Sequence, residues 1–306
     1  MRTEMGSRGR LFFVVLVGAV VLATVSFIGG TVGSLVAGRP PMSLFAVGVP
    51  HLQLEAGRPF GGLPVSNTLL ASWLTCAVVV AVFLRATRRL EIVPSGLQNL
   101  VEYVCEFAAG FIEEMVGKQH EKRFFPVVMT VFLFVLGNAW LGLLPGFDTV
   151  TVNGVPLLRS ANTDINVPLM LALFCVAMIE YWGWSTRGIS YLNSFFDVRH
   201  LRAAFSSLRL RNARACLTEF MYGVVYLFVG FLEVLGHAVR VLSFSFRLFG
   251  NMTAGVILTG VAIFLVPMVV PTVFYGLEVL FGLIQAVIFA GLTAVFGYAA
   301  VSASEQ

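Results

Sequence analysis

Residues 216–266, "CLTEFMYGVVYLFVGFLEVLGHAVRVLSFSFRLFGNMTAGVILTGVAIFLV", form one long hydrophobic helical pattern without an internal proline. At 1.5 Å per residue, roughly 45 of these residues would extend about 68 Å, which is roughly twice the hydrocarbon thickness of a bilayer. A helix of this length must tilt strongly, bend, or run partly along the membrane. Pro267 and Pro271 predict a turn, and residues 272–302 predict a return helix that is also too long to stand upright. We therefore expect two long tilted helices joined as a hairpin.

The composition of the whole chain indicates a membrane protein. Of its 306 residues, 58% are hydrophobic and only 12% are charged, and the mean hydropathy is +0.89. A soluble domain usually carries about 25% charged residues. The net charge of +4 does not indicate nucleic-acid binding, because the basic residues lie in short segments between hydrophobic runs. The expected fold class is all-α, a polytopic membrane protein with about six hydrophobic helices.

Four further hydrophobic runs predict membrane helices, over residues 11–37, 67–86, 124–144 and 164–185. The first of these is either a retained helix or a signal peptide, and its length favours the retained helix. Residues 38–66 are rich in proline and glycine and predict an external loop. The chain is thus expected to have an N-terminal part, 1–66, and a main membrane domain, 67–306.

A different pattern occupies residues 96–119, where apolar residues recur at helical spacing and four glutamates fall between them. This pattern is typical of an amphipathic helix at the cytoplasmic interface, and it is equally compatible with packing against a soluble partner.

The distribution of basic residues predicts the orientation. Residues 187–214 hold six arginines and one acidic residue, Asp197, so this segment is expected in the cytoplasm and the 145–162 loop outside. Six crossings with both termini in the cytoplasm place every basic flanking segment on the cytoplasmic side.

No cofactor or metal is expected. The four cysteines are far apart and show no metal-ligand spacing, and no nucleotide-binding or protease motif occurs. They are Cys76, Cys105, Cys175 and Cys216.

Polar residues recur at helical spacing inside the last two hydrophobic segments. Glu233, Arg240 and Arg247 are seven residues apart and therefore share one stripe of a helix. The further polar residues on these faces are His237, Ser243, Asn251, Glu278 and Gln285. A charge in the bilayer costs about 3 kcal/mol, so intramembrane ionisable residues usually line an ion path. The structural alternative is a buried ion pair such as Glu233 with Arg240, or an Arg247 side chain that caps backbone carbonyls. For His237 a purely structural role is equally compatible.

The motif "RLFGNMTAG" at 247–255 resembles the signature of subunit a of the bacterial F-type ATP synthase. The resemblance spans about residues 64–304. Three other segments also resemble this family: "FLEVLGHAVRVLSFSFRLFGN" at 231–251, "LEVLFGLIQAVIF" at 277–289 and "RSANTDINVPLMLAL" at 159–173.

This resemblance implies that protons reach carboxylates on a rotating c ring through two offset aqueous half-channels. Arg247 is similar to the family's essential arginine, which keeps the half-channels apart, and Gln285 to the glutamine beside it. The positions that the resemblance assigns to the inlet are Asn251 and Glu278. Those that it assigns to the cytoplasmic outlet are Glu233, Ser243 and the basic position Arg240.

The chain departs from the family pattern directly after "NMTAG". Many members carry Glu or His at this position, where this chain has Val256. Glu278 stands where some members have His. The inlet carboxylate is therefore expected from the return helix alone.

The resemblance implies a proton-translocating stator subunit without catalytic activity of its own, since the ATP chemistry lies on other subunits. The expected partners are the c-subunit ring, the peripheral-stalk b subunits and the lipid bilayer, with neither nucleic acid nor nucleotide bound. The expected location is the bacterial inner (plasma) membrane. A stand-alone ion channel or secondary transporter is the alternative, and it would conduct without a ring. A purely structural assembly protein would leave Arg247, Glu278 and Gln285 unexplained.

Overall fold

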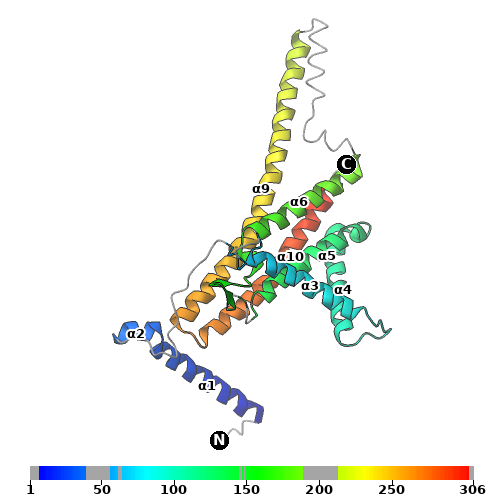
Figure 1. The fold of residues 1–306 in the computed structure, drawn as a ribbon. Helices are drawn as coiled ribbons and strands as arrows, with labels where there is room; N and C mark the ends of the chain where they lie inside the picture. The colour runs from blue at the N-terminus through cyan, green and yellow to red at the C-terminus, as the bar shows by residue number, and fades with distance from the viewer. Residues whose placement is uncertain are drawn as a thin grey trace, which may run out of the picture. The chain divides into compact units, whose positions relative to one another are not determined.

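A computed structural model of the chain describes residues 7–38, 56–60, 64–144, 147, 149–188 and 213–302 (Figure 1). Apart from one small β-hairpin, the regular structure in these ranges is helical, which confirms the predicted all-α class. Five of the described helices are long and apolar enough to cross a bilayer. They are α3 (Asn67–Ala86), α5 (Glu121–Leu141), α6 (Asn166–Arg187), α9 (Ala213–Leu265) and α10 (Val270–Ser302). The chain is thus a multi-pass membrane protein.

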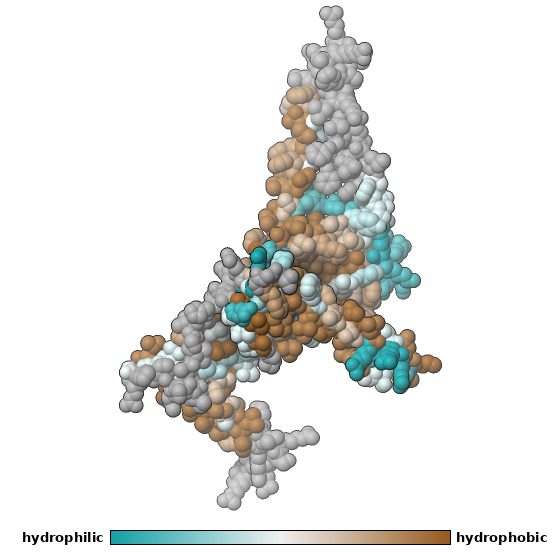
Figure 2. All heavy atoms as spheres, in the orientation of Figure 1, coloured by the Kyte–Doolittle hydropathy of each residue, from teal (hydrophilic) through white to brown (hydrophobic). Residues whose placement is uncertain are grey.

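Apolar side chains dominate the outside of these helices. Figure 2 shows the described surface as mostly brown, with hydrophilic residues gathered at the connections between α3, α4 and α5. Large hydrophobic side chains such as Phe228 and Phe231 on α9 are more than half exposed. An aqueous surface would not tolerate so many, so hydrocarbon or another subunit must cover them.

The N-terminal hydrophobic run is not the single helix predicted over 11–37. The structure has α1 (Ser7–Gly29) and α2 (Thr31–Ala37), with an extended residue, Gly30, between them. A Cβ atom at Gly30 would lie 2.6 Å from the carbonyl oxygen of Ser26. Two adjacent glycines also have low helix propensity, which explains the break. The sixth crossing and the boundary at residue 66 stay predictions.

The amphipathic helix α4 (Gly96–Val116) ends three residues before the predicted limit at 119. The cause is Gly117, whose φ of +78° is rarely open to residues with a side chain. One face of α4 buries Ala108, Ile112 and Val116. Because α4 is outside the five candidate spans, an interfacial position remains the expectation for it.

The connection between α5 and α6 holds a β-hairpin that the sequence analysis did not predict. Strands β1 (Thr151–Val152) and β2 (Val155–Pro156) pair antiparallel across Asn153 and Gly154, which have φ of 53° and 77°. Asn-Gly with positive φ at both positions is the preferred two-residue hairpin turn. The short 3-10 helix η1 (Ala161–Thr163) follows and leads into α6.

The chain forms two compact units, and each draws on the long helices. The loop unit comprises residues 1–74, 136–164 and 249–284. The helical unit comprises residues 75–135, 165–248 and 285–306.

Within each unit, α9 and α10 pack side by side as an antiparallel pair. In the helical unit, the ring centroids of the buried Phe244 on α9 and Phe289 on α10 are 4.9 Å apart. In the loop unit, α9 and α10 contact each other through Thr259 and Glu278. The chain reverses between them at residues 266–269, beside Pro267.

Candidate functional site

Glu278 is held on α10 by a partner on α9. The hydroxyl of Thr259, which is buried, donates a hydrogen bond of 2.5 Å to Oε1 of Glu278. Gly255 lies one helical turn before Thr259, and a Cβ atom there would be 3.2 Å from Cγ of Glu278. The missing side chain at Gly255 therefore makes the space that the glutamate occupies.

Glu278 lines a small cavity in the loop unit. This cavity has a volume of about 30 Å³, which is enough for a water molecule. Its polar lining comes from Glu278, Asn251 and Ser160, and Val256 contributes an apolar wall. The structure thus brings together the two predicted inlet residues, Asn251 and Glu278. Ser160 was not predicted as a site residue.

More polar side chains are buried in the same unit, close to the β-hairpin. Thr68 on α3 donates a hydrogen bond of 2.8 Å to Oδ2 of Asp164, and both residues are buried. Asn162 on η1 is fully buried, and within the described part of the chain neither atom of its amide has a hydrogen-bond partner. Such groups are costly in an apolar interior, so this region is suited to hold water.

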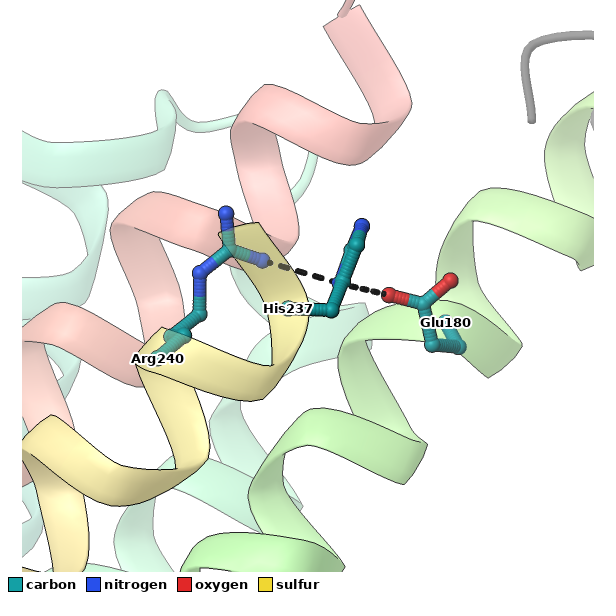
Figure 3. A network of polar contacts seen from close by, with 3 residues as sticks. All are labelled: Glu180, His237 and Arg240. Atoms are coloured by element: carbon teal, nitrogen blue, oxygen red, sulfur yellow. Dashed lines mark hydrogen bonds and ion pairs between the residues drawn. The ribbon is translucent and has the colours of Figure 1, made fainter. Parts of the chain in front are cut away.

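A second polar cluster lies in the helical unit (Figure 3). Nδ1 of His237 is 2.7 Å from Oε1 of Glu180 on α6 and 3.4 Å from Nη1 of Arg240. The guanidinium of Arg240 lies 4.3 Å from the ring centroid of Phe296 on α10, a cation–π distance. Glu180 was missed by the sequence analysis, although an acidic residue inside a predicted span is itself a signal of function.

Arg247 lies on α9 beyond this cluster. It is half-buried, and its Nη2 donates a hydrogen bond of 3.4 Å to the hydroxyl of Ser243. The contacts of Phe244 with Phe289 and of Arg240 with Phe296 set the register of α9 against α10 in the helical unit. This register places Gln285, which is buried, nearly level with Arg247.

The ion pair between Glu233 and Arg240, weighed as the structural alternative, is not present. Arg240 contacts His237 and Phe296 instead. Glu233 is half-buried one turn before His237, and among the described residues its carboxylate has no hydrogen bond or ion pair. Within the same part of the chain, no group of His, Cys, Asp and Glu could hold a metal ion.

Ionisable and polar side chains thus lie inside helices that are otherwise apolar and long enough to span a bilayer. That arrangement defines an ion-translocating, multi-pass membrane protein. The sequence profile of the family described as "ATP synthase A chain" matches residues 69–297. The chain is also 31% identical over 230 residues to the ATP synthase subunit a of Gloeobacter violaceus, covering 74% of this chain and 80% of that protein.

The chain therefore belongs to the family of subunit a of the F-type ATP synthase. It is a proton-translocating subunit of the membrane sector, Fo.

Proposed function

We propose that this chain provides two half-channels through which protons reach the carboxylates of a rotating c ring, and that it couples their flow to rotation of the ring. Each proton that falls through 100 mV releases about 2.3 kcal/mol, which is the driving force for rotation. The ATP chemistry lies on other subunits.

The observation that carries the proposal is the common cavity of Asn251 and Glu278. A cavity that is large enough for a water molecule and is lined by one carboxylate and one amide is suited to receive a proton and pass it on. We assign this cavity to the inlet half-channel. Because Val256 lines the same cavity without an ionisable group, Glu278 is its principal carboxylate.

We assign the outlet half-channel to the polar face of α9 in the helical unit. The proposed lining includes Glu233, His237, Arg240 and Ser243. Glu233 supports this assignment, because a half-buried carboxylate inside a hydrophobic helix is costly unless it meets water.

Arg247 is the proposed barrier between the half-channels. Along α9 it lies ten residues after His237 and twelve before Thr259, about three helical turns from each. A guanidinium stays protonated when desolvated, so it blocks proton passage and keeps a facing ring carboxylate ionised. Ser243 and Gln285 can hydrogen-bond this group without neutralising it.

The proposed partners are the c-subunit ring, the peripheral-stalk b subunits and the lipid bilayer. The proposed location is the bacterial inner membrane, with both termini in the cytoplasm. The basic 187–214 segment that predicts this orientation lies almost wholly outside the described residues.

Accessibility of single cysteines tests the two half-channels in the assembled synthase without its native cysteines. Asn251→Cys should react with a membrane-impermeant thiol reagent only from the outside, and His237→Cys only from the cytoplasm. Thr149→Cys and Ser206→Cys mark the external loop and the cytoplasmic segment. Reaction of both channel positions from one side contradicts the proposal.

A further inference from the structure

One nitrogen of His237 lies between a hydrogen-bond donor and an acceptor. Figure 3 shows the imidazole between Arg240 and Glu180, with both contacts reaching Nδ1. A guanidinium can only donate and an ionised carboxylate can only accept. A single nitrogen cannot serve both partners at once, because it donates when it carries a proton and accepts when it does not.

Two arrangements of protons are open to this geometry, and each satisfies one contact of Nδ1 at a time. In the first, Nδ1 carries a proton and donates to ionised Glu180. In the second, Glu180 carries the proton, and the single lone pair of Nδ1 accepts one hydrogen bond, either from Glu180 or from Arg240. The two differ by the transfer of a proton across the 2.7 Å ion-pair contact between Nδ1 and Oε1, and the imidazole must turn slightly to point an Nδ1–H bond at that oxygen.

We infer that Glu180 and His237 form a proton relay, with Arg240 as the positioning residue that holds the imidazole. A proton that arrives at Nε2 of the neutral imidazole gives an imidazolium. Its Nδ1–H bond then breaks, and an O–H bond forms on Glu180. The neutral imidazole keeps its proton on Nε2, and Glu180 releases its proton to water. A rotation of the ring then points the remaining N–H bond, on Nε2, at Glu180, so that Nδ1 can receive the next proton. One proton enters, one leaves and no electrons are transferred.

The partial exposure of the two side chains is more compatible with a proton relay than with a fully buried ion pair. The side chains of His237 and Glu180 keep 19% and 31% of their surface exposed, although the contacting oxygen, Oε1 of Glu180, is buried. The rest of each side chain is therefore open to a neighbouring proton carrier. Arg240 is itself fixed against Phe296. Other charged groups on these helices include Glu233, one turn before His237 on α9, and Arg123 on α5. Arg123 binds the hydroxyl of Thr186 and the carbonyl of Trp182 on α6.

This inference rests on the proposed outlet, and its test uses the assembled synthase in inverted vesicles. Glu180→Gln and His237→Gln keep side chains that hydrogen-bond but cannot pass a proton on. We expect each to lower ATP-driven proton pumping at least about tenfold, because a positioned proton-transfer group contributes about 10²–10⁴-fold. Co-purification of the membrane sector reports assembly. Glu106→Gln, an exposed acid on α4, is the matched control and should pump normally.

Two further variants separate a relay from a structural contact. Glu180→Asp keeps the acid and should recover part of the rate. The double variant of Glu180→Gln with His237→Gln should be no slower than either single variant, because the two groups act in series. Multiplied losses, or a rate close to wild type in assembled His237→Gln or Glu180→Gln, overturn the relay. If Arg247→Ala abolishes pumping while Glu180→Gln does not, the relay alone is wrong. If Arg247→Ala pumps normally, the proposed function is wrong.

Discussion

The hydroxyl of Thr259 on α9 donates a hydrogen bond of 2.5 Å to Oε1 of Glu278 on α10. This contact joins the two long helices within the loop unit and fixes one oxygen of the residue that lines the cavity together with Asn251. The position of the proposed inlet carboxylate is therefore set by the neighbouring helix as well as by its own.

Replacement of Thr259 tests whether this contact matters for proton transfer. Thr259→Val keeps the shape of the side chain and removes the donor. A hydrogen bond to a charged group contributes about 1.5–3 kcal/mol, and 1.36 kcal/mol corresponds to tenfold in rate, so pumping should fall by roughly 10- to 150-fold. Thr259→Ser retains the hydroxyl and should pump at close to the normal rate. ATP-driven quenching of a pH-sensitive dye in inverted vesicles measures the pumping rate of both variants. Equal rates for Thr259→Val and Thr259→Ser would show that the hydrogen bond does not contribute to proton transfer.

Glu278 itself should be required for the inlet. Glu278→Gln is expected to slow ATP-driven pumping strongly while the complex still assembles, because no other ionisable side chain among the described residues lines this cavity. Since Val256 lines the same cavity, Val256→Glu in the Glu278→Gln background should restore part of the flux. Near-normal pumping by Glu278→Gln would exclude Glu278 from the proton path.

A side chain at Gly255 should displace the carboxyl group of Glu278. In Gly255→Ala, the new Cβ atom would lie 3.2 Å from Cγ and 3.3 Å from Oε1 of Glu278, so the carboxyl group must move. We expect slower pumping with normal assembly. Gly276→Ala on α10 is the control, because nothing lies within 4 Å of a Cβ atom at that position. The same loss in both variants would show a general effect of helix composition instead.

The thiol of Cys105 on α4 should react slowly with alkylating reagents. Burial, together with the negative charge of Glu102, raises the pKa of Cys105. The thiolate is the reactive form, so alkylation at pH 7 should be slow and should speed up as the pH rises. With Cys105 as the only cysteine, Glu102→Gln should lower the pKa and accelerate alkylation, whereas Glu114→Gln should not. An unchanged rate after Glu102→Gln would contradict the assigned cause.

Hydropathy was sufficient to predict much of the helical fold. The predicted span at 67–86 has the bounds of α3, and the helix predicted at 216–266 corresponds to α9, Ala213–Leu265. The break at Gly30 was missed, because hydropathy stays high across two adjacent glycines. The hairpin around Asn153 and Gly154 was also missed, although Asn-Gly is a strong turn signal.

Site residues could be predicted only where their spacing along one helix, or a motif, indicates a common role. Asn251 and Glu278 were chosen by resemblance, and their common cavity depends on the packing of α9 against α10 and on Ser160 from a distant loop. Glu180 was missed because its partner, His237, is 57 positions away on another helix. The spacing of Glu233 and Arg240 on one stripe left an ion pair open as the alternative to an ion path, but Arg240 contacts His237 and Phe296 instead.

The central claim is that the charge of Arg247 separates two half-channels. The measurement that tests it most directly is proton flux, followed by dye fluorescence, in vesicles that contain the assembled synthase with Arg247→Ala. We expect ATP synthesis and ATP-driven pumping to fall to background and a passive proton leak to appear under an imposed potential, because the barrier is gone. Arg247→Lys should retain little or no coupled activity, since a buried lysine can lose its proton. ATP synthesis by Arg247→Ala close to the wild-type rate, without a leak, would contradict the account.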